Sequence, residues 1–142
     1  MKRIQVVAGV IYRNYTTLGH SDNALILIAR RPDHLHQGGL WEFPGGKVEP
    51  NERHYDSLVR ELKEELNITV KSASPLMQIS HDYSDKSVTL DIWKVTKFDG
   101  YAEGVEGQET RWVPLSELRD YNFPTANQPI LERLISDQSP LA

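Results

Sequence analysis

The feature that most constrains this 142-residue chain is a glycine pair followed by a short helix crowded with carboxylates. The pair is Gly45-Gly46, and the helix is expected from about Glu52 to Leu66. Three acids fall within five residues of this helix, namely Glu61, Glu64 and Glu65. At about 3.6 residues per turn these side chains lie within about 100° of one another, so they repel one another unless a cation lies over them. The pattern therefore predicts a site for Mg²⁺, with Mn²⁺ as the alternative, because both cations prefer carboxylate oxygens.

The same helix also fits a simpler interpretation, in which its charges are solvated and form ion pairs. Arg60 and Glu64 are four residues apart, a spacing at which opposite charges on a helix attract each other. Against this interpretation, the glycine pair and the charged residues together satisfy a long pattern of fixed spacings. Gly46 is followed by five residues and Glu52, then by seven residues and Arg60-Glu61, then by Leu62, Lys63 and Glu64-Glu65.

This pattern resembles the signature of the Nudix family and matches it at every defined position except one. Asn67 stands where the family has a glycine just after the helix. Asn is the best non-glycine residue for a left-handed helix end, so we expect the fold to tolerate it. The resemblance implies an α/β/α sandwich with a mixed β-sheet, and metal-dependent hydrolysis of a nucleoside diphosphate linkage. It also implies a set of metal ligands: the carbonyl of Gly45 and the carboxylates of Glu61, Glu64, Glu65 and Glu106.

Segments outside the signature resemble the MutT-type branch of the family, from residue 1 to about 135. They are Met1–Val6, Ala29–Arg31, Leu40–Lys47, Glu106–Gln108 and Phe123–Asn127. The branch converts nucleoside triphosphates to monophosphate and pyrophosphate, and 8-oxo-dGTP is the substrate that the resemblance implies here. Glu61 is the first candidate to orient or deprotonate the attacking water, with Glu106 second. Arg60 is expected to hold the carboxylates in position.

The resemblance to this branch also indicates residues that would bind the substrate. Arg31 would meet the nucleotide and Lys47 a phosphate, although either side chain also fits an ordinary surface position. Phe43 would stack on the base, or else belong to the core as most strand aromatics do. His36 would lie at the rim of the pocket, or else face solvent in its polar loop.

Asn127 is the residue from which we predict the base preference. Its simplest role is to cap the last helix, which Asn does well. Its side-chain amide also presents a donor and an acceptor side by side. Guanine offers two acceptors on its N7/O6 edge, whereas 8-oxoguanine carries a hydrogen on N7 and so offers the donor and acceptor that an amide matches. The amide also suits adenine, so the shape of the pocket must help to reject that base.

Two other functions remain open at this point. The segments 39–43 and 47–50 also resemble pyrophosphohydrolases of CTP or of modified pyrimidine triphosphates. A kinetic comparison of purine and pyrimidine triphosphates would separate that function from the first. The other alternative is a non-catalytic nucleotide-binding module on the same fold. Such a module usually loses acids of the signature, and all of them are present here.

Composition restricts the class of partner. A net charge of −4 disfavours the binding of long nucleic acids, which requires a basic face, so a free nucleoside triphosphate is the expected partner. The absence of cysteine excludes disulfides, thiolate catalysis and Cys-ligated zinc. No apolar run approaches the roughly 20 residues of a membrane span. We expect a single domain over residues 1–142, a monomer and a cytoplasmic location.

Hydrophobic patterning predicts the order of the elements. Strands are expected at 4–12, 24–29, 41–43, 77–81, 88–95 and 110–113. Asn51 is expected to cap the carboxylate helix. The residues of this helix that would face the core are Tyr55, Leu58, Val59, Leu62 and Leu66. The segment 44–46 would end the third strand, a helical turn would follow at 114–118, and a final helix would run from about 128 to 136.

Overall fold

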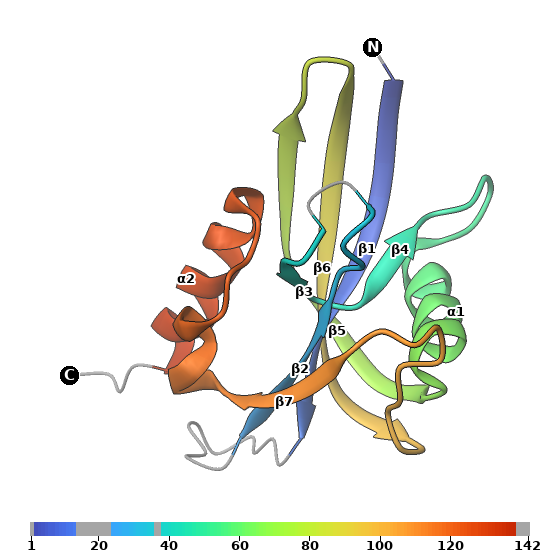
Figure 1. Ribbon diagram of the computed structural model, residues 1–142. Coiled ribbons are helices and arrows are strands. Elements are labelled where there is room, and N and C mark those ends of the chain that lie inside the picture. The colour runs from blue at the N-terminus through green and yellow to red at the C-terminus, as the bar shows by residue number, and fades with distance from the viewer. Residues whose placement is uncertain (1, 14–23, 36–37, 139–142) are drawn as a thin grey trace.

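The computed structural model describes residues 2–13, 24–35 and 38–138, which form a mixed sheet with a helix on each side (Figure 1). The strands are β1 (Lys2–Arg13), β2 (Leu25–Arg30), β3 (Trp41–Glu42), β4 (Gly45–Lys47), β5 (Thr69–Asp82), β6 (Lys86–Asp99) and β7 (Thr110–Pro114). The helices are α1 (His54–Leu66) and α2 (Gln128–Gln138), with the 3₁₀ turns η1 (Leu115–Asp120) and η2 (Thr125–Asn127). The expected α/β/α sandwich is confirmed.

The sheet is organised around β1. Its strand order is β3-β2-β1-β6-β5, and β4 pairs with β1 while β7 pairs with β2. β1 and β6 run parallel, from the pair Lys2↔Lys86 to the pair Ile11↔Val95. Every other pairing is antiparallel, which makes the sheet mixed. β1 thus touches the glycine pair through β4 and the β5–β6 hairpin through β6, and so connects the segments that form the site.

Both faces of β1 are buried, as its continuous apolar sequence predicts. Val7 and Ile11 pack with the leucines of α1 on one face. Val10 and Tyr12 pack on the other face, in the cluster that includes the apolar side of α2. The alternation of side chains along a strand produces these two separate cores. α1 and α2 therefore lie on opposite sides of the sheet (Figure 1).

The start of α1 differs from the expectation. Asn51 does not cap the helix; it has a φ of 64°, and the cap is Arg53, so α1 begins at His54. The physical reason is a tight turn just before the helix, in which the Glu52 N–H donates to the carbonyl of Glu49 at 3.1 Å. Within the helix, Leu58, Leu62 and Leu66 are fully buried as predicted. Tyr55 and Val59 are only partly buried.

The glycine pair also behaves differently from the expected loop. Residues 45–47 form strand β4, in which Gly45 pairs with Ala8 and Gly46 with Val7. A Cβ on Gly45 would collide with the Val7 carbonyl, so only glycine lets β4 lie this close to β1. The sequence did not predict this pairing because glycine has a low β-propensity. The long-range contact with β1 overrides that local preference.

The remaining elements match the expectations in place but not always in length. β5 and β6 extend well beyond the predicted 77–81 and 88–95, into half-exposed and polar segments without a clear apolar signal. η1 occupies 115–120 rather than 114–118. In α2, Ile130, Leu131 and Leu134 are buried as predicted, whereas Ile135 is only partly buried. None of the helices in the described ranges is long and apolar enough to cross a membrane.

Asn67 ends α1 in the left-handed conformation, as its place in the signature predicts. Its φ is 58° and ψ is 37°, and its N–H donates to the carbonyl of Lys63 at 3.0 Å. A β-branched residue is strained in this conformation, whereas glycine is not.

We expect Asn67→Gly to keep the melting temperature of the native chain to within about 2 °C, and Asn67→Val to lower it by about 3–8 °C. Thermal unfolding followed by circular dichroism is the measurement. Both substitutions remove the same side-chain amide, so the difference between them reports the backbone conformation alone. Equal melting temperatures for the two variants would contradict this account of the helix end.

Candidate active site

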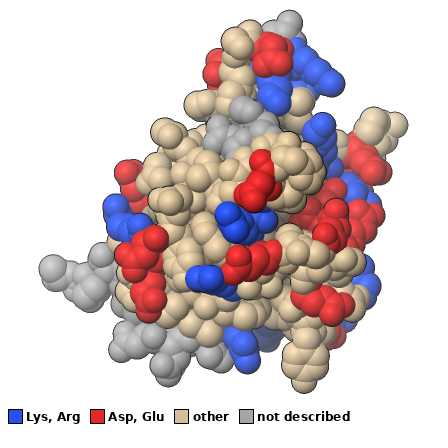
Figure 2. All heavy atoms as spheres, viewed as in Figure 1, with Lys and Arg blue, Asp and Glu red and all other residues tan. Residues whose placement is uncertain are grey.

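The site is built on the contact between the glycine strand and α1. Gly46 lies directly against the carboxyl group of Glu61, in space that a Cβ would fill. The Glu61 side chain is consequently only 15% exposed, whereas that of Glu64 is 61% exposed. Glu65 is partly buried. The exposure of the three acids on this arc therefore ranges from shielded to open. On the surface of the molecule, acidic side chains gather on the side where α1 lies (Figure 2).

Arg60 holds several of these acids at once. Its Nε and Nη2 donate to the two oxygens of Glu52, each at 2.9 Å. Its Nη1 donates to Glu61 at 2.9 Å and more weakly to Glu64 at 3.4 Å. Nη2 also donates to the carbonyl of Lys47 at 3.1 Å. The guanidinium thus joins the strand before the helix to the helix itself, which agrees with the expected positioning role.

The charge of Glu52 is stabilised by this contact. Hydrogen bonds from Arg60, and then from the hydroxyl of Ser57, lower the pKa of Glu52 from 4.5 to about 2. Ser57 is buried and its Oγ donates to Glu52 at 2.5 Å. Glu52 therefore stays ionised across the physiological range and keeps Arg60 in place.

Glu65 has the opposite electrostatic environment. Burial raises its pKa most, and repulsion from Glu61, Glu42 and Glu106 raises it further, to about 8. A hydrogen bond from the backbone of Gly45 opposes the shift. Burial likewise raises the pKa of Glu61, against the influence of Arg60. This end of α1 therefore concentrates more negative charge than the surrounding cations neutralise.

Glu106 reaches this region through a loop that docks on the C-terminal end of α1. The amide of Gln108 donates to the carbonyl of Glu65 at 3.1 Å and accepts from the N–H of Glu106 at 2.9 Å. The N–H of Val105 also donates to the Glu65 carbonyl at 3.1 Å. Gln108 is a positioning residue to which the sequence analysis assigned no role of its own. Its placement brings Glu106 close enough to Glu65 to raise the pKa of Glu65.

The donor chemistry fits a divalent cation. Within the ranges that the structure describes, no group of three or more His, Asp or Glu side chains is arranged to hold a metal ion as it stands. Arg60 binds both Glu61 and Glu64, which are two of the predicted ligands. A hard cation among these carboxylates would relieve the repulsion that raises the pKa of Glu65. The metal-ligand roles of Gly45, Glu61, Glu64, Glu65 and Glu106 stay predictions.

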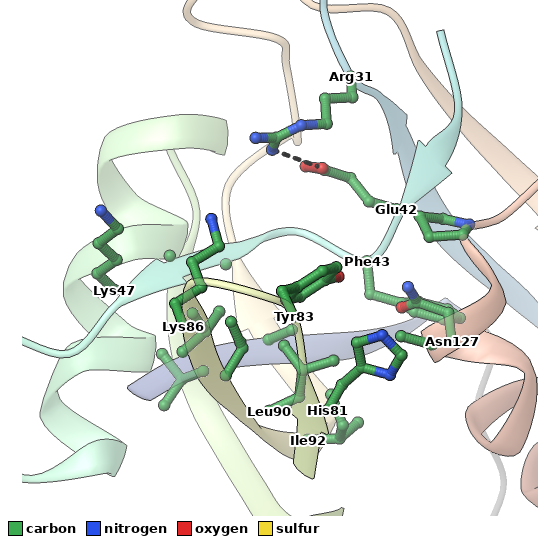
Figure 3. A pocket seen from close by; sticks show the side chains of 18 residues that line it. Arg31, Glu42, Phe43, Lys47, His81, Tyr83, Lys86, Leu90, Ile92 and Asn127 are labelled. Carbon is green, nitrogen blue, oxygen red and sulfur yellow. Dashed lines mark hydrogen bonds and ion pairs between the residues drawn. The ribbon is translucent and has the colours of Figure 1, made fainter. Parts of the chain in front are cut away.

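A cavity of about 290 Å³ adjoins the glycine pair and brings most of the predicted substrate residues together (Figure 3). Arg31, Phe43, Lys47 and Asn127 all line it, while His36 lies outside the described residues. The polar lining residues for which the sequence predicts no site role are Glu42, His81, Tyr83 and Lys86. Of these, His81 pairs with Val88 in the β5–β6 hairpin, so the strands expected at 77–81 and 88–95 were the available signal.

Phe43 and Arg31 each have protein partners within this cavity wall. Phe43 is 5% exposed and stacks on Phe123 at 5.2 Å, so it belongs to the core and also presents an apolar surface to the cavity. Arg31 forms an ion pair with Glu42 at 3.3 Å (Figure 3). Burial raises the pKa of Glu42 while Arg31 lowers it. The cavity is thus apolar in its interior and charged where it approaches the carboxylates.

The raised pKa of Glu65 predicts a pH-dependent stability in the absence of metal. The folded state holds this proton between pH 4.5 and about 8, where the unfolded state does not, so the free energy of unfolding falls as pH rises through this window. Glu65→Gln removes this contribution. In EDTA, the melting temperature of the variant should therefore decrease less between pH 5 and pH 8 than that of the native chain.

At pH 8, Mg²⁺ should raise the melting temperature of Glu65→Gln less than that of the native chain. The variant should also lose most of its turnover, because Gln is a poorer ligand for a hard cation than a carboxylate. Glu117→Gln, at an exposed position of η1, is the matched control. Parallel pH curves for the native chain and Glu65→Gln in EDTA would contradict the electrostatic assignment. Full activity of Glu65→Gln at low Mg²⁺ would contradict its role in metal binding.

Comparison with known proteins gives the family. A family model described as NUDIX domain matches residues 15–133. The chain is 35% identical to the 8-oxo-dGTP diphosphatase of Escherichia coli over 94% of this chain and 98% of that protein. It is 37% identical to the CTP pyrophosphohydrolase of Escherichia coli, over 96% and 94% of the two chains. A solved structure, from work on MutT of Aliivibrio salmonicida and Vibrio cholerae, matches this chain with a TM-score of 0.78. The two are 42% identical in sequence, and the match covers 95% of this chain and 98% of the other. The chain belongs to the Nudix family of hydrolases.

Proposed function

We propose that this Nudix hydrolase converts 8-oxo-dGTP to 8-oxo-dGMP and pyrophosphate, with Mg²⁺ or Mn²⁺ as cofactor. The observation that carries the base assignment is the position of Asn127, which lines the cavity next to the glycine pair. It is the last residue of η2, and its backbone N–H donates to the carbonyl of Pro124 at 2.9 Å. Across the part of the chain that the structure describes, no hydrogen bond of its side-chain amide is found.

An amide that faces a cavity in this way supports base recognition over a purely structural role. Its donor and acceptor are available to a ligand, and an apolar pocket with a few polar groups is the usual form of a small-molecule site. 8-Oxoguanine satisfies both atoms of the amide through O6 and N7–H, whereas guanine places a lone pair where a hydrogen is needed. Leaving one such group unsatisfied costs about 1–3 kcal/mol, or about 10- to 100-fold in affinity.

The catalytic part of the proposal assigns roles to the residues around the glycine strand. Gly45, Glu61, Glu64, Glu65 and Glu106 would hold the divalent cation. When bound, the cation supplies charge neutralisation of the phosphates and makes a bound water more acidic. Glu61, whose carboxylate is shielded and held by Arg60, is our first candidate to orient or deprotonate that water, with Glu106 second.

The cations of the cavity complete the phosphate site. Lys47 would contact a phosphate and Arg31 would contact the nucleotide, and both side chains line the cavity. We infer that the protein acts on free nucleotides, because a net charge of −4 disfavours polymeric nucleic acid. We also propose that it is a cytoplasmic monomer.

A second candidate function is hydrolysis of CTP or a modified pyrimidine triphosphate. It is favoured by the 37% identity to a CTP pyrophosphohydrolase, which is as extensive as the identity to the 8-oxo-dGTP diphosphatase. Cytosine also offers a donor and an acceptor side by side, at N4 and N3, so Asn127 by itself does not reject it. Values of kcat/KM for 8-oxo-dGTP, dGTP and CTP with Mg²⁺ decide between the two functions.

The first prediction from this function concerns Asn127. The native chain should prefer 8-oxo-dGTP to dGTP in kcat/KM, and Asn127→Ala should lose most of this preference while pyrophosphate release continues. The expected loss is about 10- to 100-fold on 8-oxo-dGTP and much less on dGTP. Asn127→Asp, which keeps the shape but removes the donor, is the companion variant. Equal kcat/KM for the two nucleotides in the native chain would refute the assignment and favour the pyrimidine alternative.

The second prediction concerns the bond that is broken. If water attacks the β-phosphorus, hydrolysis in ¹⁸O-labelled water should place the label in pyrophosphate and leave the monophosphate unlabelled. Mass spectrometry of the two products is the measurement, and dGTP is a suitable substrate because the position of attack does not depend on the base. Label found only in the monophosphate, or orthophosphate as the first product, would contradict this mechanism.

A further inference from the structure

His81 is a polar residue of the cavity wall to which the proposed function assigns no role. It lies near the end of β5, where it pairs with Val88 of β6, and it lines the cavity together with the apolar Leu90 and Ile92. Figure 3 shows the imidazole next to Asn127, whereas Lys47 and Lys86 lie toward the other end of the cavity. His81 thus belongs to the end of the cavity where the base is expected, away from the phosphate side.

The ring of His81 has a packing partner, but its nitrogens do not. The imidazole contacts the ring of Tyr83 edge to face, with 4.6 Å between centroids. No hydrogen bond of its nitrogens is found within the described ranges, and every fully buried side-chain nitrogen or oxygen there has a partner. The polar atoms of His81 are therefore accessible, on a residue that lines the cavity. A polar group in an apolar wall is usually satisfied by the ligand that fills the pocket.

We propose that His81 reads the base together with Asn127, by donating a hydrogen bond to a carbonyl oxygen of 8-oxoguanine. This inference rests on the proposed function. The oxidised base presents three functional atoms in a row, O6, N7–H and O8, in the order acceptor, donor, acceptor. The amide of Asn127 matches two adjacent atoms of this row. The N–H of the neutral imidazole matches the carbonyl that remains.

Guanine does not support the same arrangement. It lacks the hydrogen on N7, so it cannot satisfy both amide atoms of Asn127. It also lacks O8, so it has no carbonyl at the position that His81 would contact. His81 is in this view a specificity-determining residue for the reaction. A purely structural His81 would instead act through its packing on Tyr83, which a phenyl ring of similar shape preserves.

The test compares two substitutions of His81 by steady-state kinetics on 8-oxo-dGTP and dGTP. His81→Phe keeps the ring and removes the donor, and His81→Asn keeps a donor and removes the ring. We expect His81→Phe to lower kcat/KM for 8-oxo-dGTP by about 10-fold, mainly through KM, and that for dGTP by less than about 3-fold. His81→Asn should recover part of the selectivity. His34→Phe, at an exposed histidine, is the control and should match the native chain.

The outcomes separate this inference from the function on which it rests. If the native chain prefers 8-oxo-dGTP and His81→Phe retains the native ratio of the two kcat/KM values, His81 does not read the base while the proposed function stands. An equal loss on both nucleotides would also overturn the inference, because it indicates a general structural effect. If the native chain does not prefer 8-oxo-dGTP over dGTP, the proposed substrate fails first, and the three-point reading of the base fails with it.

Discussion

The site depends on one interaction, the fork of hydrogen bonds from Arg60 to Glu52. It joins the turn before α1 to the middle of the helix, at 2.9 Å for each bond, and the same guanidinium reaches Glu61. Because these contacts hold the pKa of Glu52 at about 2, the ion pair persists over the range in which an enzyme of this kind works. Arg60 therefore holds the carboxylate of Glu61 beside the glycine strand, although the neighbouring acids repel it.

The rest of the fold fixes α1 against this repulsion. The leucines of α1 anchor it to one face of the sheet. At its first residue, His54 contacts the buried Asp91 at 2.8 Å, and Trp93 donates to the same carboxylate at 2.9 Å. At its last turn, Asn67 and the loop that carries Gln108 close over the helix end. α1 is thus held at both ends and along one side, so the acids cannot separate by moving the backbone. Burial, and then repulsion from the neighbouring acids, accordingly raises the pKa of Glu65.

Features of the fold and the site that depend on residues close together in the sequence could be predicted from it, whereas those that depend on long-range contacts could not. The carboxylate helix, its buried leucines and the left-handed Asn67 follow from local periodicity and backbone preference, and all were predicted correctly. The cap at Asn51 was wrong because a turn stabilised by Glu49 and Glu52 competes for the same residues. The strand at 45–47 was missed because its pairing with β1 is determined by long-range packing. The functional roles of the acids and of Asn127 stay predictions.

In the proposed function, reaction and base preference come from separate parts of the molecule, and this explains why the family signature indicates the first better than the second. Arg60, Glu61, Glu64 and Glu65 lie on α1, shortly after the glycine pair and Glu52, so a run of neighbouring residues contains the family signature. The base end of the cavity combines η2 with the β5–β6 hairpin, which are far apart in sequence and meet only in the folded chain. No spacing in the sequence predicts that His81 and Asn127 line the same cavity. Relatives that are 35% and 37% identical to this chain bear the names of different nucleotides. In the proposed function, the choice between such nucleotides depends on the polar groups of the cavity wall.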